Sequence, residues 1–159
     1  MLKTATQEGF TLIELLVTLI VGLILASTVI PSLASFYHAH RSDSEIRKAQ
    51  QLLVFARNQA ISYGLNVTVC PIGEHINSCG VDWLRGITVL YDKNGVDQSI
   101  KLINGFSSQD SLTFASKPII FSPDGLASTS AVMTYCSGDR PSNCQSLRLL
   151  ASGRVNTLH

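Results

Sequence analysis

Charged residues are scarce in this chain of 159 residues, because only 14% of them are Asp, Glu, Lys or Arg. That fraction is well below the value usual for a soluble domain. The formal net charge is +1, which excludes a chain that is polycationic as a whole. The shortage is concentrated at one end, where residues 10–30 include one charged side chain, Glu14. A helix over these residues would be about 31 Å long, which matches the apolar core of a membrane.

The sequence also lacks the short signatures of common enzymes. It has no G-x-S-x-G, no H-E-x-x-H, no Walker loop and no dinucleotide fingerprint. No two cysteines have the C-x2-C spacing of a zinc site, so we expect no metal. We predict a protein that is not an enzyme, needs no cofactor and takes no small-molecule substrate. A secreted enzyme on a membrane anchor is the competing class, and no motif favours it.

The single carboxylate in the apolar run needs a physical reason. An acidic side chain at the centre of a membrane helix costs roughly 2.5–3.5 kcal/mol on insertion scales, and less near an interface. A secretory signal peptide does not fit, because its apolar core is shorter and ends at a cleavage site. A plain transmembrane anchor explains the length of the run but gives Glu14 no role. We therefore expect Glu14 to have a cationic partner.

The stretch GFTLIELL, residues 9–16, resembles the processing site of type IV pilins and of the pseudopilins of type II secretion. The resemblance implies that residues 1–9 are a cytoplasmic leader. A membrane peptidase would cut between Gly9 and Phe10, and the new amino terminus would be methylated. Glu14 would then pair with the Phe10 amine of a neighbouring subunit, which makes Glu14 an assembly residue.

Residues 31–64 are predicted to continue the helix as an amphipathic segment, because apolar residues recur there at helical spacing. Pro31 lies where it would bend the axis, and the pilin family has a proline at this point of its long helix. Gly64 suits the C-terminal cap. The sequence SDSE, from Ser42 to Glu45, would fit a capping box and hence a break. We favour one bent helix through this point.

Residues 65–159 change to short β-rich runs separated by Gly, Ser, Pro and Asp. The runs are NVTVC, GITVLY, SIKLI, PIIFS, VMTYC and LRLLA, with Asn94-Gly95 as a hairpin signal. An antiparallel β head on a helix makes the predicted fold class α+β. We expect Trp83 and Phe121 in the core of this head.

The order of several motifs resembles the minor pilins of the FimT/FimU type and the H-type pseudopilins. The motifs are ARNQAI, VTVC, WLRGITVLYDKNG, FSPDG and LLASGRV, and together they cover nearly the whole chain. The resemblance implies a type IV pilin-like fold, in which a long bent N-terminal helix, embedded in the membrane over its first half, packs on an antiparallel β-sheet. It implies an inner-membrane protein with a periplasmic head that later joins a cell-surface pilus. Its partners would be other pilins, minor pilins and the prepilin peptidase.

The implied function is that of a minor pilin at or near the pilus tip, where its helix and Glu14 prime assembly. Two alternatives rest on the same motifs. One is an H-type pseudopilin of type II protein secretion. The other is a DNA-binding minor pilin for DNA uptake in natural transformation.

DNA contact in some FimT-like relatives is attributed to a C-terminal Gly-Arg-x-Arg loop. Here Gly153 and Arg154 match, but Asn156 replaces the second arginine, which weakens the inference. Residues 65–139 have four Lys/Arg and seven Asp/Glu, whereas the segment after them has no acid. The cations of this last segment are Arg140, Arg148 and Arg154. They would either bind the phosphates of DNA or balance the charge of nearby acidic residues.

All four cysteines follow the apolar run, which places them on the extracytoplasmic side; they are Cys70, Cys79, Cys136 and Cys144. An even number of cysteines in an oxidising compartment predicts disulfides. Three pairings are possible. We favour Cys70–Cys79 with Cys136–Cys144, since each of these closes a short loop.

Overall fold

One long helix precedes all the strands of the fold. The computed structural model describes residues 10–93, 96–138 and 143–158, and only the backbone at 28–32, 34, 35 and 93. The helix α1 spans Leu12–Tyr63 without interruption. The chain divides into two compact units, Met1–Tyr37 and His38–His159, so α1 contributes to both.

The helix ends at Tyr63, before the predicted cap Gly64, and it has no break at Ser42. Gly64 has φ 65°, and its N–H donates to the carbonyl of Ala60 at 3.0 Å, which is a common C-terminal cap. α1 continues through Ser42 and Glu45, because the Ser42 side chain bonds to the head instead of capping a new helix. The helix also includes Pro31, whose side chain lies outside the described part of the chain.

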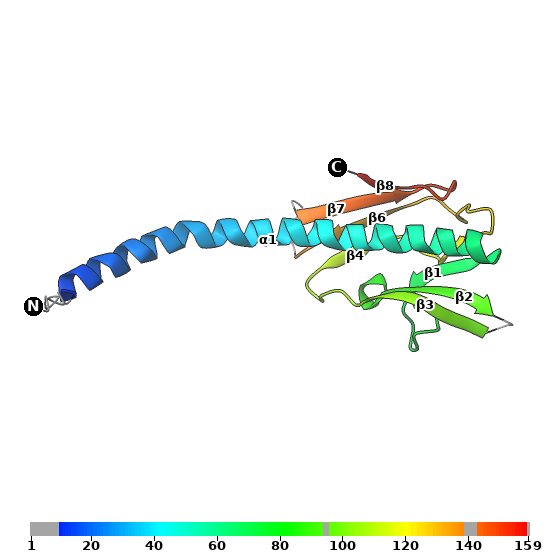
Figure 1. Cartoon of the computed structure of the whole chain (residues 1–159), viewed down its shortest axis with the longest axis horizontal. Coiled ribbons are helices and arrows are strands. Elements are labelled where there is room, and N and C mark those ends of the chain that lie inside the picture. Colours follow the sequence, from blue (N-terminus) through cyan, green and yellow to red (C-terminus); the bar gives the residue numbers. More distant parts are fainter. Residues whose placement is uncertain (1–9, 94–95, 139–142, 159) are drawn as a thin grey trace, which may run out of the picture. The chain divides into compact units, whose positions relative to one another are not determined.

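Two antiparallel sheets of four strands form in the second unit (Figure 1). The first has the order β3-β2-β1-β5, with the strands β1 Val67–Pro71, β2 Gly86–Lys93, β3 Val96–Asn104 and β5 Ile119–Phe121. The second has the order β4-β6-β7-β8, with β4 Ser111–Thr113, β6 Ala131–Cys136, β7 Cys144–Leu149 and β8 Val155–Leu158. A short 3-10 helix, Trp83–Arg85, precedes β2. The α+β class is confirmed, and the head holds two sheets.

Two strands were not predicted, and one turn cannot be compared. β4 has three residues and β8 four, so neither forms a long alternating run. The expected Asn94-Gly95 turn lies outside the described residues. β2 and β3 on either side of it pair antiparallel, with Lys93 opposite Val96.

A single apolar core joins α1 to both sheets. The helix contributes a stripe at spacings of three and four residues, formed by Ile46, Ala49, Leu52, Leu53, Ala56 and Ala60, all at most 2% exposed. Both sheets turn apolar side chains toward this stripe, among them Val67, Val69, Phe121, Met133, Tyr135, Leu147 and Leu149. Burying one large apolar side chain contributes about 1.5–3 kcal/mol, so this stripe fixes the sheets to the helix.

Two disulfides close short loops in the head. They join Cys70 to Cys79 and Cys136 to Cys144, at sequence separations of nine and eight, which is the pairing that the sequence favours. The second bond links β6 and β7 directly, because its two residues lie opposite each other. Trp83 and Phe121 are buried, as expected, at 7% and 0% exposure.

Candidate functional site

The first turns of α1 place Glu14 close to the start of the helix. Thr11 precedes the helix, and its hydroxyl oxygen accepts a bond of 3.4 Å from the Glu14 N–H. The same hydroxyl donates to the Glu14 carboxylate at 3.4 Å. A carboxylate in the first turn also interacts favourably with the positive end of the helix dipole. Glu14 therefore has a local role as well as the predicted role in assembly.

The apolar side chains of α1 from Leu12 to Leu25 are exposed on every side of the helix. Their exposed fractions run from 47% at Leu16 to 82% at Leu12, and Phe10 is 78% exposed. The others are Ile13, Leu15, Val17, Leu19, Ile20, Val21, Leu23, Ile24 and Leu25. A continuous apolar surface of this size marks a site that another molecule covers.

Among the described residues, no helix combines the length and the hydropathy that crossing a membrane requires.

Three of the predicted site positions fall outside what the structure describes. They are the processing residue Gly9, the side chain of Pro31 and the candidate DNA-binding residue Arg140.

The C-terminal hairpin of β7 and β8 brings together two of the remaining candidate DNA-binding residues. Arg148 lies opposite Asn156 in the ladder, and Arg154 comes two residues before Asn156. Because the side chains of Leu147 and Leu149 point into the core, Arg148 is on the outer face of the sheet. Arg154 and Arg148 are both exposed, and within the described part of the chain neither forms an ion pair.

Gly153 has a structural role next to Arg154. It is buried with φ 75°, a conformation that glycine adopts easily. A Cβ here would collide with the carbonyl oxygen of Gly125 and would lie 2.8 Å from Nε of Arg57. Arg57 in α1 donates to that same carbonyl at 3.0 Å. The turn that presents Arg154 is thus packed against the helix through a contact that only glycine permits.

The neighbouring FSPDG turn is held by its own side chains. Asp124 accepts a hydrogen bond from the Ser122 hydroxyl and a longer one, 3.4 Å, from the N–H of Leu126. These bonds to the charged form lower the pKa of Asp124, the one from Ser122 most strongly. The Ala127 N–H donates to the Ala151 carbonyl at 2.9 Å, which joins this turn to the β7–β8 hairpin.

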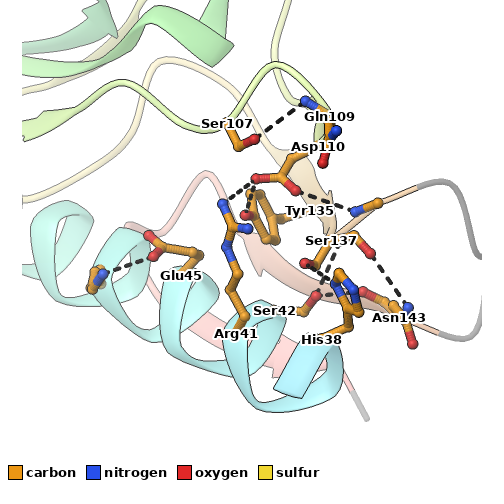
Figure 2. A network of polar contacts seen from close by, with 12 residues as sticks. His38, Arg41, Ser42, Glu45, Ser107, Gln109, Asp110, Tyr135, Ser137 and Asn143 are labelled. Carbon is orange, nitrogen blue, oxygen red and sulfur yellow. Dashed lines mark hydrogen bonds and ion pairs between the residues drawn. The ribbon is translucent and has the colours of Figure 1, made fainter. Parts of the chain in front are cut away.

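A polar network ties α1 to the second sheet (Figure 2). Asp110, whose side chain is 1% exposed, accepts hydrogen bonds from Arg41 at 2.6 Å, Tyr135 at 2.7 Å and the Gly138 N–H at 3.2 Å. One cation and two further donors offset the loss of hydration of this carboxylate. Burial, followed by the hydrogen bond to Asp110, raises the pKa of Tyr135 far above its usual range.

A second group in Figure 2 fastens both ends of the Cys136–Cys144 loop to the helix. The buried Ser42 hydroxyl donates a short hydrogen bond to the Asn143 carbonyl and accepts one of 3.2 Å from the Ser137 N–H. His38 Nδ1 lies 2.9 Å from the Ser137 hydroxyl. In the described ranges, no three His, Cys, Asp or Glu side chains gather as a metal site would require.

Comparison with protein families identifies the chain. The family model described as type II transport protein GspH matches residues 45–153, and the prokaryotic N-terminal methylation motif matches residues 4–30. The chain belongs to the GspH family. The methylation motif covers Gly9, Phe10 and Glu14, and the GspH match covers both disulfides and the hairpin up to Gly153.

Solved structures show that this GspH-family chain has the type IV pilin-like fold. The type IV minor pilin FimU of Pseudomonas aeruginosa matches with a TM-score of 0.63 at 16% identity, over 78% of this chain and 92% of FimU. The minor pseudopilin EpsH of the type 2 secretion system of Vibrio cholerae matches with a TM-score of 0.57 at 17% identity, over 74% of this chain and 95% of EpsH. A search of curated proteins found no match.

Several residues that matter in this GspH-family chain were missed by sequence reasoning. Thr11 carried a usable signal, because Thr-x-x-Glu over residues 11–14 is a capping-box pattern. Asp110 and Tyr135 carried none, since their partners are distant in sequence. Arg57 belongs to the ARNQAI motif, but its contact with Gly125 depends on the fold and not on the local sequence.

Proposed function

We propose that this chain is a minor pilin, processed by the prepilin peptidase and incorporated into a type IV pilus at or near its tip, where it primes assembly. The main support is the exposed apolar surface formed by Phe10 and by α1 up to Leu25, with Glu14 as its only charged group. Such a surface needs lipid or other apolar helices around it. The role is structural, and no step of it requires catalysis by this chain.

The mechanism uses charge pairing inside an apolar bundle. Before assembly, residues 10–30 would lie in the inner membrane with the head in the periplasm. Cleavage between Gly9 and Phe10 creates a positive amine, which remains charged after methylation. Glu14 of one subunit pairs with the Phe10 amine of its neighbour, because a buried carboxylate is tolerated when a cation accompanies it. This pairing sets the vertical register between subunits.

The amino terminus of the mature protein provides the first test. Mass spectrometry of the protein from its native membrane should find a chain that begins at Phe10 and bears one N-methyl group. Deleting the peptidase should leave the chain beginning at Met1. A mature chain that begins elsewhere, or an uncleaved chain in cells with active peptidase, would contradict the proposal.

A second test separates the pilus from the secretion system, since a type IV minor pilin and a minor pseudopilin both match this fold. Deletion of this chain should reduce surface pili and twitching while secretion of type II substrates continues. Loss of secretion with normal twitching would instead assign the chain to the pseudopilins.

DNA binding for natural transformation is a second candidate function, favoured by the outer face of the β7–β8 hairpin. Arg148 and Arg154 are exposed on this hairpin without an ion pair among the described residues. Two or three phosphate contacts would give weak binding that depends on salt. Because Asn156 lies directly opposite Arg148, it marks where a further cation would extend this surface.

A mobility-shift titration of the full chain in neutral detergent with double-stranded DNA at two salt concentrations tests this candidate. Arg154→Ala should weaken binding and reduce the salt slope by about one, and Asn156→Arg should increase both. Arg85→Ala is the matched control, since Arg85 is exposed at the other sheet. Equal losses in Arg154→Ala and Arg85→Ala, or no binding at low salt, would reject a DNA site on the hairpin.

A further inference from the structure

A groove with a volume of about 430 Å³ runs between α1 and the strand β3. One wall is the helix, whose long polar side chains in the groove are Arg41, Glu45, Lys48 and Gln51. The other wall is the last part of β3, residues Lys101–Asn104, followed by the segment up to Ser107. Concave sites of this volume are within the range that binds ligands or peptide segments.

The wall formed by β3 is an open sheet edge. β3 is the outermost strand of its sheet and pairs only with β2 (Figure 1), so alternate N–H and C=O groups point away from the sheet. Earlier in the strand, Asn77 protects the edge by accepting a bond of 3.1 Å from the Ser99 N–H. Among the described residues, no such side-chain bond protects Lys101–Asn104. The part of the edge that borders the groove therefore has no side-chain protection of this kind.

The charges around the groove favour a negatively charged ligand. Two of the cations already have carboxylate partners, since Arg41 pairs with Asp110 and Lys48 with Glu45 at 2.7 Å. Lys101 has no carboxylate partner in the described part of the chain, and its Nζ lies 4.5 Å from the centre of the Phe55 ring on α1. The groove thus presents one uncompensated cation beside free backbone donors and acceptors.

We propose that this groove, defined by Arg41, Glu45, Lys48 and Gln51 of α1 and by Lys101–Asn104 of β3, binds an extended acidic peptide segment that adds a strand to β3. The backbone of the segment hydrogen-bonds to the open edge, as in other cases of strand addition. A carboxylate of the segment pairs with Lys101. The site shares no residue with the apolar part of α1 or with the C-terminal hairpin, so it is independent of the proposed function.

Defined peptides test the proposal on the full chain in neutral detergent. The probe is fluorescent acetyl-Thr-Val-Glu-Val-Glu-Val-Thr-amide, and two companions isolate its features. One has lysine in place of both glutamates. The other keeps the glutamates but has N-methyl groups on consecutive residues. These groups remove backbone N–H donors on both sides of the peptide, so it cannot pair with β3 as a strand. Fluorescence anisotropy measures affinity, and amide hydrogen exchange measures protection at Lys101–Asn104.

The acidic probe should bind and slow exchange at Lys101–Asn104. The basic peptide should bind up to about fivefold more weakly, because it loses the ion pair with Lys101. The N-methylated peptide should bind more weakly because it cannot form the backbone hydrogen bonds of strand addition. Lys101→Glu should reverse the preference from the acidic to the basic peptide. Lys117→Glu, an equal change of charge at an exposed lysine outside the groove, should leave the preference unchanged.

Three results would overturn the proposal. The first is no binding of the acidic probe to the wild-type chain. The second is equal binding of the N-methylated peptide, which would exclude strand addition without use of any variant. The third is an equal effect of Lys117→Glu and Lys101→Glu, which would reduce the binding to general surface charge.

Discussion

Two stretches of the same helix differ in how far their apolar side chains are exposed to solvent. Between Leu12 and Leu25 the apolar side chains are 47–82% exposed and face all directions. Between Ile46 and Ala60 most of them form one stripe that is at most 2% exposed, whereas Val54, outside the stripe, is 41% exposed. Charged residues occupy other faces of this stretch. Backbone conformation is the same in both stretches, so the arrangement of side chains alone makes the difference.

The difference separates folding from assembly. A stripe can be covered by one sheet on each side, and the head of this chain provides two such sheets. A surface that is apolar all round needs neighbours all round, which no single chain of this size provides. The second stretch should therefore determine the stability of the head, and the first should determine association with lipid or with other subunits.

The largest expected effect comes from truncating the buried stripe. Leu52→Ala should lower the free energy of unfolding of the head by about 3 kcal/mol, since it leaves a cavity under both sheets. Urea titration of the full chain in detergent, followed by the fluorescence of the single Trp83, measures this change. Leu19→Ala, which is the same truncation at an exposed position, should leave the midpoint unchanged. Equal effects in the two variants would remove the distinction between the stretches.

The disulfide at the helix contact comes next. Replacing Cys136 and Cys144 by serine should lower the free energy of unfolding by about 2.5 kcal/mol through the loop-closure entropy of the unfolded chain. Hydrogen exchange should rise in the part of α1 around Ser42, which is fastened to this loop, and remain unchanged before Leu25. Unaltered exchange at Ser42 would show that the loop does not hold the helix.

Gly153→Ala tests how the hairpin is fixed to the buried stretch. The added Cβ meets the Gly125 carbonyl and Arg57, and φ 75° is unfavourable for alanine, so the loss should be about 2 kcal/mol. The DNA binding proposed for the hairpin should fall with it because Arg154 shifts. A matched change, Gly64→Ala, has the same backbone conformation but nothing within 4 Å, so it should cost about 1 kcal/mol.

The smallest effect concerns pH. The pKa of Tyr135 is higher in the folded head than the usual value of about 10 in the unfolded chain. The folded state thus holds this proton more tightly, so its stabilising effect is complete below pH 10 and is lost as the pH rises above 10. Tyr135→Phe should lower stability by about 1 kcal/mol at neutral pH. The gap between this variant and the wild type should narrow above pH 10; a constant gap would contradict the raised pKa.

Sequence patterns located most of the fold because those patterns are local. The end of α1 at Tyr63, the α+β class and the buried Trp83 follow from spacing and composition. The break considered at Ser42 did not form, because its hydroxyl is used by Ser137 and Asn143, about a hundred residues away in sequence. Asp110 and the groove beside β3 likewise depend on contacts between distant segments, which no local pattern reports.

The candidate site residues likewise include some that a local pattern predicts and some whose arrangement depends on contacts between distant segments. Gly9, Phe10 and Glu14 were predicted as processing and assembly residues from one contiguous stretch, which the methylation motif covers. The exposed Arg148 and Arg154 were found as a charge excess, but their shared face depends on the register of β7 and β8. The role of Glu14 as a partner of the Phe10 amine stays a prediction.

The most direct measurement compares Glu14→Gln with Glu14→Ala in a deletion strain, scoring the amount of processed protein and the fraction recovered with sheared pili. Glutamine keeps the shape and the hydrogen-bonding capacity of the side chain near Thr11 but removes its charge. If charge pairing organises assembly, both variants should be cleaved at Gly9 and both should be nearly absent from pili. If Glu14→Gln enters pili as the wild type does, Glu14 serves as a local cap of α1, and the pairing with the Phe10 amine is wrong.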